Sequence, residues 1–288
     1  ERFVPEFTEL TERFGIQAIQ PLAAEAVITR AGTVVGPVLR EITGHPELTR
    51  YRGGWSGSET YPGLVEDSTR RRIGDLVERF SDRLAEEGYR GILEVSILLD
   101  TDTGDVYLGE LNPRISGSSP HSNLTPGDTT LPLFAYHVLE YSGVEFELDL
   151  DEIRAQREAA LDGQVWTTLI IQHPAPGTPE IEEAPRTGRY RISSDSGDLE
   201  FLAADTDWQG LTEPDEVFWI RAVEAGDVAS VGVDLGMLVT RTRAQEEHYA
   251  LRDDTKRLIL ALQALYRHRP VSTVRRFWRA GLRRLLGR

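Results

Sequence analysis

Cysteine is absent from this sequence of 288 residues, which excludes disulfides, thiolate nucleophiles and metal sites built from cysteine. The absence permits an intracellular location, and we expect the protein to be cytoplasmic. Apolar runs long enough to cross a bilayer are also missing, so no transmembrane helix is predicted. Lysine is nearly absent: Lys256 stands alone, and the other basic residues are arginines.

Positive charge is in short supply as well. The net charge at pH 7 is -15 and the pI is near 4.9, whereas a protein that binds nucleic-acid phosphates without sequence preference needs a cationic face. We therefore exclude nucleic acid as a partner and expect small molecules instead. The length allows two domains, because a domain typically takes about 150 residues.

The first half of the chain predicts a mixture of strands and helices. Short apolar runs alternate with small residues around a turn at Ala31 and Gly32, and a helical spacing of apolar residues follows, ending at Gly88. In order, the predicted elements are two strands within 16–40, a glycine-rich loop at 51–63, a helix at 68–87, a β-hairpin with strands at 91–99 and 106–111, and a helix at 130–141.

The second half predicts a smaller β-rich unit. An acidic helix over 149–163 leads into short strands with the sequences WTTLIIQH, GRYRI and EVFWIRAV, followed by a helix over 245–266. The last residues alternate apolar side chains with arginines, which predicts a basic amphipathic helix over 269–288. Two interpretations of this helix stay open: docking to a membrane surface or an acidic partner, and packing against the protein with the basic face in solvent.

Oxygen ligands gather on the predicted hairpin. Glu94 lies on its first strand, and the two-residue period of a strand places Glu110 and Asn112 on one face of the second. Such a set suits Mg²⁺, a hard cation usually held by one or two carboxylates together with substrate phosphates. Arg114, two residues further on, is placed to meet an anionic substrate or a transferring phosphoryl group. An exposed hairpin with solvated side chains explains any two of these residues, but not the whole arrangement.

The hairpin sequence GYRGILEVSILLDTDTGDVYLGELNPRISGSS, residues 88–119, resembles the metal-binding signature of the ATP-grasp superfamily, which includes biotin carboxylases and carboxylate-amine ligases. The resemblance implies an α+β ATP-grasp fold followed by a smaller β-rich domain, with ATP and Mg²⁺ or Mn²⁺ as cofactors. It further implies that Glu94, Glu110 and Asn112 bind the metal. Arg114 is implied as the catalytic residue that contacts the phosphates or the acyl phosphate.

A second segment, LTRYRGGWSGSE, resembles the glycine-rich loop that closes over the ATP phosphates in this superfamily. The backbone N–H groups of Gly53, Gly54 and Gly57 could cradle phosphate oxygens, and Arg52 adds positive charge. An ordinary surface loop is the better explanation for this segment taken alone. Beside the hairpin, we favour phosphate binding.

The lysines that usually contact the nucleotide phosphates in this superfamily are missing from the matching region. Either arginines such as Arg40 and Arg52 replace them, or they belong to a preceding lobe outside this sequence, which is the explanation we favour. The predicted organisation is an ATP-grasp domain over 1–149 without its N-terminal lobe, a smaller β-rich capping domain over 150–268, and the basic helix over 269–288.

These features predict an ATP-dependent ligase that activates a carboxylate as an acyl phosphate for attack by an amine. Its partners would be ATP, a small-molecule carboxylate and an amine acceptor, and a homodimer is compatible with the sequence. A biotin carboxylase-like activity on bicarbonate comes second, because SGSSPHSN departs from the residues that follow the arginine in biotin carboxylases. A non-catalytic protein that keeps the fold is a further alternative. His121, His137 and His173 lack the spacing of metal ligands and are expected to be structural.

Overall fold

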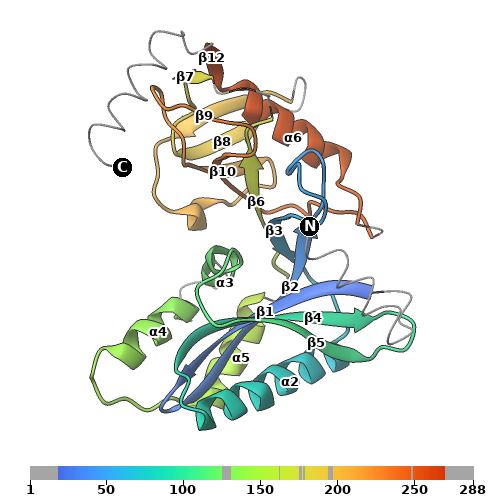
Figure 1. Cartoon of the computed structure of the whole chain (residues 1–288), viewed down its shortest axis with the longest axis vertical. Helices are drawn as coiled ribbons and strands as arrows, with labels where there is room; N and C mark the ends of the chain where they lie inside the picture. The colour runs from blue at the N-terminus through green and yellow to red at the C-terminus, as the bar shows by residue number, and fades with distance from the viewer. Residues whose placement is uncertain are drawn as a thin grey trace.

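One antiparallel sheet runs through the protein. The computed structural model describes residues 19–124, 131–161, 163–174, 177, 179–193, 197–247 and 249–269. Within them, ten strands pair in the order β5-β4-β1-β2-β3-β6-β11-β10-β8-β9, and β12 pairs with β7 in a separate sheet. Figure 1 shows the long strands of the first half at one end of the molecule and the shorter strands of the second half at the other.

The first half contributes five strands to this sheet. They are β1 (Ile19–Thr29), β2 (Gly32–Thr43), β3 (Trp55–Thr60), β4 (Gly91–Asp100) and β5 (Val106–Asn112). The predicted turn at Ala31 and Gly32 joins β1 to β2, and Gly32 has a φ of 126° there. The second predicted hairpin is β4 and β5, with Gly104 in its turn at a φ of 75°. Both hairpins are confirmed.

Helix α2 (Asp67–Glu86) covers one face of these strands. Its apolar stripe, which includes Ile73 and Val77, packs against Leu22 and other buried residues of β1 and β4. Gly88 follows the helix at a φ of 93°, and its N–H donates to a carbonyl of the last turn at 3.1 Å. The predicted helix and its glycine at the C-terminal end are therefore confirmed.

The opposite face of the same strands is covered by α4 (Leu133–Tyr141) and α5 (Leu150–Leu161), which confirms both predicted helices with shorter bounds. Tyr136 of α4 packs in a buried cluster with Val27 and Ile92. The short helix α3 (Ser119–Leu124) lies between the two halves of the molecule (Figure 1).

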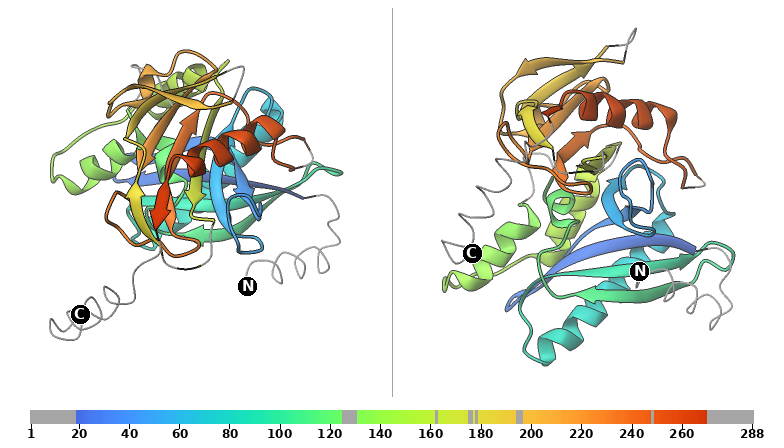
Figure 2. Two further views of the ribbon diagram at one scale, coloured as in Figure 1. Left: turned by 90° about the horizontal axis from the view of Figure 1, so that it is seen from above. Right: turned by 45° about the horizontal axis from the view of Figure 1, so that its top comes forward.

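The second half is β-rich, as predicted. Its elements are β6 (Trp166–Gln172), β7 (Glu180–Glu183), β8 (Gly188–Ile192), β9 (Leu199–Ala203), a 3₁₀ turn (Trp208–Gly210), β10 (Glu216–Arg221), β11 (Asp234–Thr240), α6 (Asp253–Ala264) and β12 (Arg267–Arg269). Figure 2 shows α6 lying across one face of the strands. The fold is thus α+β throughout, with the helices concentrated in the first half.

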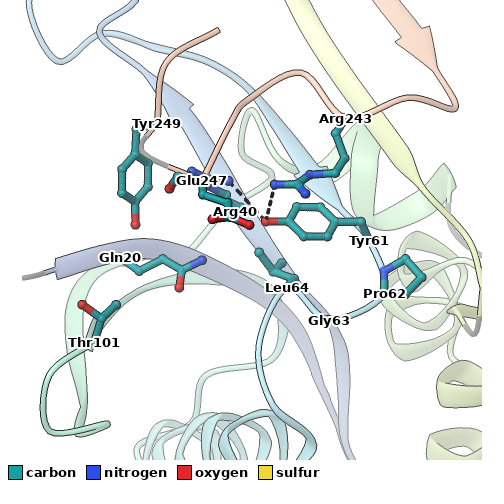
Figure 3. A pocket seen from close by; sticks show the side chains of 10 residues that line it. All are labelled: Gln20, Arg40, Tyr61, Pro62, Gly63, Leu64, Thr101, Arg243, Glu247 and Tyr249. Atoms are coloured by element: carbon teal, nitrogen blue, oxygen red, sulfur yellow. Dashed lines mark hydrogen bonds between the residues drawn. The ribbon is translucent and has the colours of Figure 1, made fainter. Parts of the chain in front are cut away.

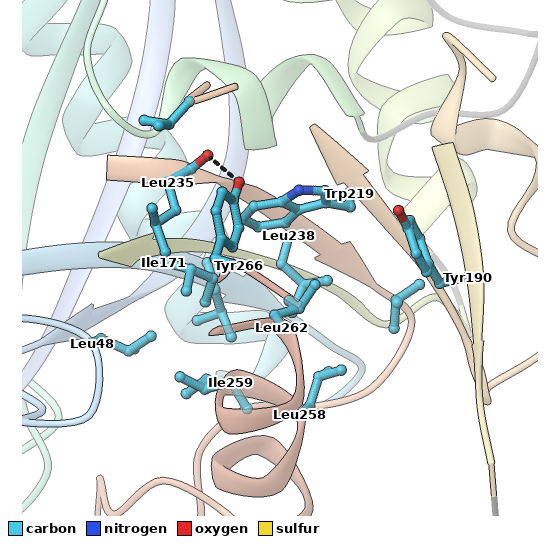
Figure 4. Packing of buried hydrophobic residues seen from close by; sticks show 14 of the residues in the cluster. Leu48, Ile171, Tyr190, Trp219, Leu235, Leu238, Leu258, Ile259, Leu262 and Tyr266 are labelled. Atoms are coloured by element: carbon cyan, nitrogen blue, oxygen red, sulfur yellow. Dashed lines mark hydrogen bonds between the residues drawn. The ribbon is translucent and has the colours of Figure 1, made fainter. Parts of the chain in front are cut away.

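A buried cluster joins the two halves. Leu262 of α6 and Trp219 of β10 pack in one cluster with Ile42 and Leu48, which come from the first half. Figure 4 shows Leu48, Trp219 and Leu262 in this cluster. The pairing of β3 with β6 also crosses the boundary predicted at residue 149. The division of the chain into two domains stays a prediction, and unfolding experiments can test it.

The glycine-rich segment 51–63 is not a loop throughout, so that prediction was wrong. Residues 55–60 form β3, which pairs with β2 on one side and β6 on the other. Ser58 and Glu59 are both fully buried there. The sequence SGSET is polar and is therefore typical of a loop. It forms a strand because its polar side chains have partners that lie far away in the sequence.

The helix predicted over 245–266 begins only at Asp253, which corrects its first bound. The backbone N–H groups of Ala244 and Gln245 donate instead to the buried carboxylate of Glu59, at 2.7 and 3.3 Å. A tertiary contact therefore replaces the first turns of the predicted helix.

Among the described residues, no helix is long and apolar enough to cross a membrane. Apart from Arg269, the basic helix predicted over 269–288 lies outside the described residues. Its two interpretations stay open.

Candidate active site

Three polar side chains form a row across neighbouring strands. Glu25 of β1 lies opposite Glu94 of β4, and Glu94 lies opposite Asn112 of β5. Residues directly opposite each other point to the same face of a sheet. The Asn112 Nδ2 donates to Glu94 Oε1 at 3.4 Å. The structure therefore brings Glu94 and Asn112 together, as the sequence predicted, and adds Glu25.

Irregular pairing flanks this row. Between Leu108 and Leu111, β5 has one residue more than the paired stretch of β4, which places Glu110 at a bulge. A second register shift, between β1 and β2, lies at Glu25. Bulges are common next to active sites, where they re-aim a side chain. Here Glu110, beside the row, is exposed while Glu25 is fully buried, so the site extends from solvent into the protein.

Serines of the segment after β5 hold that segment over the row. Ser116 Oγ is hydrogen-bonded to Glu25 at 3.0 Å and also to Glu94, and Ser119 Oγ donates to Glu25. The N–H of Ser116 in turn donates to Ser119 Oγ at 3.0 Å. Glu25 is therefore an anchor for the segment that follows Arg114.

Two carboxyl groups on this face have a raised pKa. Burial raises the pKa of Glu25 to about 7, although hydrogen bonds from the serines oppose the effect. Burial, assisted by the negative charges of Glu94 and Glu110, raises the pKa of Glu41 on β2 to about 8. Burial therefore favours the protonated form of both carboxyl groups.

Arg114 is exposed where the hairpin ends. Its Nη2 donates to Asn112 Oδ1 at 3.0 Å, and its Nη1 donates to the carbonyl of Ile115 at 3.2 Å. The guanidinium is thus held next to the row and stays accessible to a ligand. All four residues predicted on the hairpin lie in one small region.

The donor chemistry of this region fits Mg²⁺. Glu94, Glu110 and Asn112 supply two carboxylates and an amide oxygen, and a divalent cation would offset the negative charges of Glu94 and Glu110, which add to the effect of burial on the pKa of Glu41. Within the part of the chain that the structure describes, no three His, Cys, Asp or Glu side chains gather tightly enough to hold a metal by themselves. The amide, water and substrate phosphates would have to complete the ligand set, as is usual for Mg²⁺.

The turn before β3 carries three of the predicted phosphate-binding residues. Arg52 is exposed, and Gly53 has a φ of 76°. The N–H of Gly54 donates to the carbonyl of Tyr51 at 2.9 Å, so the turn itself uses this group. Phosphate binding by Arg52, Gly53 and Gly54 stays a prediction.

Gly57 has a structural role that the sequence did not reveal. It lies inside β3 at a φ of 150°, and a Cβ added there would lie 2.0 Å from the carbonyl oxygen of Thr168 on β6. Close approach of two strands therefore explains the glycine, and a flexible loop does not. The phosphate contact predicted for Gly57 stays a prediction.

The three histidines make contacts within the fold. His121 is fully buried with Nδ1 3.3 Å from Thr168 Oγ1, and burial lowers its pKa to about 3. His137 Nδ1 accepts from the N–H of Ile92 at 3.1 Å, and His173 packs against another histidine ring. These contacts agree with the structural roles predicted for them.

Glu25, Glu41, Ser116 and Ser119 were not among the predicted site residues. A signal for Glu25 is present in the sequence, because it is a single acid in the otherwise apolar stretch PLAAEAVI, whereas Glu41 follows Arg40 in VLREI and is less conspicuous. A charged residue in a buried strand needs a partner or a function. The serines carry no such signal, since polar residues are expected in a loop.

Comparison with protein-family models and with curated proteins finds no match to the sequence. Comparison with solved structures does. The biotin carboxylase subunit of pyruvate carboxylase superposes with a TM-score of 0.54 at 14% identity, over 89% of this chain and 47% of that one. Biotin carboxylase from Campylobacter jejuni gives a TM-score of 0.52 at 13% identity, over 82% and 46%. The fold is the ATP-grasp fold.

Pyruvate carboxylase from Rhizobium etli extends the likeness to 92% of this chain, with a TM-score of 0.55 at 14% identity, over 23% of that larger protein. The chain spans about half the length of the separate biotin carboxylase structures that it matches. At these identities the likeness establishes the fold, so the ATP-grasp resemblance of the hairpin is confirmed at that level.

Proposed function

We propose that this chain carries the metal-binding and phosphate-binding part of an ATP-dependent ligase, which activates a carboxylate as an acyl phosphate for attack by an amine. The observation that carries the proposal is the contact chain of Glu94, Asn112 and Arg114 beside Glu110. An ordinary exposed hairpin has no structural need for this combination. The similar biotin carboxylases support the proposal, since they are described in complexes with nucleotide, Mg²⁺ and bicarbonate.

In this proposal, a carboxylate oxygen of the substrate attacks the γ-phosphorus of ATP, and the bond from phosphorus to the β-phosphate oxygen breaks to release ADP. Glu94, Glu110 and Asn112 would hold Mg²⁺, which would neutralise part of the phosphate charge. Arg114 binds the transferring phosphoryl group and then the acyl phosphate. The amine attacks the acyl carbon, inorganic phosphate leaves, and the amine proton passes to solvent.

The remaining side chains serve as support. Glu25 accepts from Ser116 and Ser119, which fixes the segment after Arg114 against the sheet. Catalysis of phosphoryl transfer depends mainly on positioning and charge neutralisation. A rigid attachment of this segment therefore contributes to the orientation of Arg114.

The test is ATP binding and ADP formation with Mg²⁺, measured with candidate carboxylates and amines present. We expect the Glu110→Gln variant to lower turnover by roughly a hundredfold, because it removes one negative ligand from the metal. Glu200→Gln is the matched control, since Glu200 is exposed on β9 at the far edge of the sheet. Equal activity in wild type and Glu110→Gln would refute the assigned metal site.

Two alternatives remain distinguishable in the same assay. A biotin carboxylase-like enzyme would require bicarbonate, and not an organic carboxylate with an amine, for ATP turnover. A non-catalytic protein would bind ATP with Mg²⁺ and form no ADP under any substrate condition. Absence of ATP binding altogether would contradict all three.

A further inference from the structure

A cavity of about 550 Å³ lies away from the candidate active site, on the other face of the sheet. Arg40 lines it, and Arg40 is the neighbour of Glu41 on β2, so their side chains point to opposite faces. Arg40 pairs with Leu22, which faces α2. The sheet therefore separates this cavity from Glu94 and Asn112.

Two guanidinium groups converge in the cavity. Arg40 Nη1 and Arg243 Nη2 donate to the hydroxyl of Tyr61 at 3.2 and 3.3 Å (Figure 3). Each guanidinium also lies over an aromatic ring: Arg40 over Tyr249 at 4.3 Å and Arg243 over Tyr61 at 4.0 Å. The Nε atoms of both arginines are buried without a hydrogen-bond partner.

One carboxylate lies beside these charges, and Arg40 Nη2 also donates to the carbonyls of Glu246 and Glu247 at 2.9 and 3.2 Å. Arg40 is 2% exposed and lies 3.5 Å from the buried carboxylate of Glu59. Glu59 also accepts from the N–H groups of Ala244 and Gln245. Among the described residues, no carboxylate forms an ion pair with Arg243. Glu247, the one acid among the described residues that line the cavity, is exposed.

One residue that lines the cavity, Tyr249, has an unusual backbone conformation. Tyr249 has a φ of 65°, and among the described residues it is the only non-glycine residue with a positive φ. Such conformations cost free energy, and they cluster at ligand sites. Here the conformation puts the Tyr249 ring over Arg40, while Gln20, Leu64 and Thr101 complete the wall.

We propose that this cavity binds a small oxyanion, a carboxylate or a phosphate, between Arg40 and Arg243, at a second site distinct from the candidate active site. Guanidinium groups recognise both anions through charge-assisted hydrogen bonds. An anion here would place a second negative charge beside two guanidinium groups that otherwise share the single carboxylate of Glu59. The inference does not depend on the proposed ligase activity.

Isothermal titration at constant ionic strength tests the site, with inorganic phosphate and malonate as separate probes for the two anion classes. We expect saturable binding of one of them. Arg243→Met should weaken that binding by at least about tenfold, because it removes a charged donor while keeping a side chain of similar length. Arg40 is unsuitable for this test, since its removal leaves Glu59 buried without its charge partner.

Matched variants exclude a general effect of charge. Arg241→Met is the closest control, because Arg241 lies two residues away and stacks over Trp166 at 4.7 Å without lining the cavity. Arg114→Met excludes binding at the candidate active site. Both should change the affinity by less than about twofold. Gln20→Glu keeps the shape of the wall and adds a negative charge, so it should weaken binding even if Arg243→Met fails to fold.

The proposal is overturned if neither probe binds the wild-type protein, or if Gln20→Glu binds as tightly as wild type. It is also overturned if Arg241→Met or Arg114→Met weakens binding as much as Arg243→Met does. A loss of anion affinity that is confined to Arg243→Met and Gln20→Glu supports the site. The probe that binds then identifies the class of anion.

Discussion

At the scale of single residues, the most consequential side chain is a buried acid in an apolar strand. Glu25 is fully buried, and burial raises its pKa from 4.5 to about 7. Two serines after Arg114 bond to its carboxyl group. Its protonation therefore couples the stability of the fold to the segment that carries the predicted catalytic arginine.

This coupling predicts a pH dependence with a definite sign. Between about pH 4.5 and 7, the folded chain holds a proton on Glu25 that the unfolded chain has released. Glu25 therefore contributes stability below this range, and that contribution is lost as the pH rises through it. Glu25→Gln carries no such proton, so its free energy of unfolding should rise relative to wild type by up to about 3 kcal/mol between pH 4.5 and 8.

Urea unfolding across this pH range, with EDTA present to remove divalent cations, measures the difference. The contribution of Glu41 is present in both proteins and cancels in the comparison. Glu200→Gln, at an exposed edge position, should change the free energy of unfolding little. A difference between Glu25→Gln and wild type that stays constant with pH would show that Glu25 does not titrate as described.

At the scale of elements, β3 decides how the two halves of the sheet are joined. It is the strand between β2 and β6, and Gly57 within it approaches the carbonyl of Thr168 so closely that a Cβ would lie 2.0 Å away. The contact is between two backbones, so a side chain cannot rotate to relieve it. The pairing of β3 with β6 therefore depends on the glycine at position 57.

We predict that Gly57→Ala destabilises the protein by about 3 kcal/mol or more, because it combines a backbone clash with an unfavourable φ. Gly74→Ala is the matched control within α2, where a Cβ would meet nothing within 4 Å. That change should stabilise the protein by roughly 1 kcal/mol through helix propensity. Thermal and urea unfolding compare the two variants, and a harmless Gly57→Ala would contradict the close approach of β3 and β6.

At the scale of the whole molecule, the continuous sheet and the shared core favour unfolding as one unit. Leu262 of α6 is fully buried in the cluster that also contains Ile42 and Leu48 of the first half. Loss of its side chain leaves a cavity in a core that both halves share. The loss of stability should therefore extend to the first half of the chain.

Leu262→Ala should cost about 2–5 kcal/mol, in line with other large-to-small changes in cores. Hydrogen exchange followed by mass spectrometry should show the same loss of protection in β4 and in β10. Leu260→Ala, on the same helix but 63% exposed, should change stability by less than about 0.5 kcal/mol. Loss of protection confined to β10 would instead support separate domains divided near residue 149.

The sequence by itself determined the parts of this protein that depend on local periodicity. The helix α2, both hairpins and the positions of Glu94, Asn112 and Arg114 follow from spacings within one or two adjacent elements. A strand period of two and a helical stripe are both set by neighbouring residues. The ATP-grasp resemblance rested on the same short stretch, and the fold confirmed it.

Only the tertiary structure decided what depends on partners far apart in the chain. β3 became a strand because β2 and β6 satisfy its backbone on both sides, and Glu25 joined the site because serines 91 and 94 residues away bond to it. The convergence of Arg40 and Arg243 on the hydroxyl of Tyr61 has the same origin. Strand pairing across long loops brings such residues together, and no local pattern in the sequence records it.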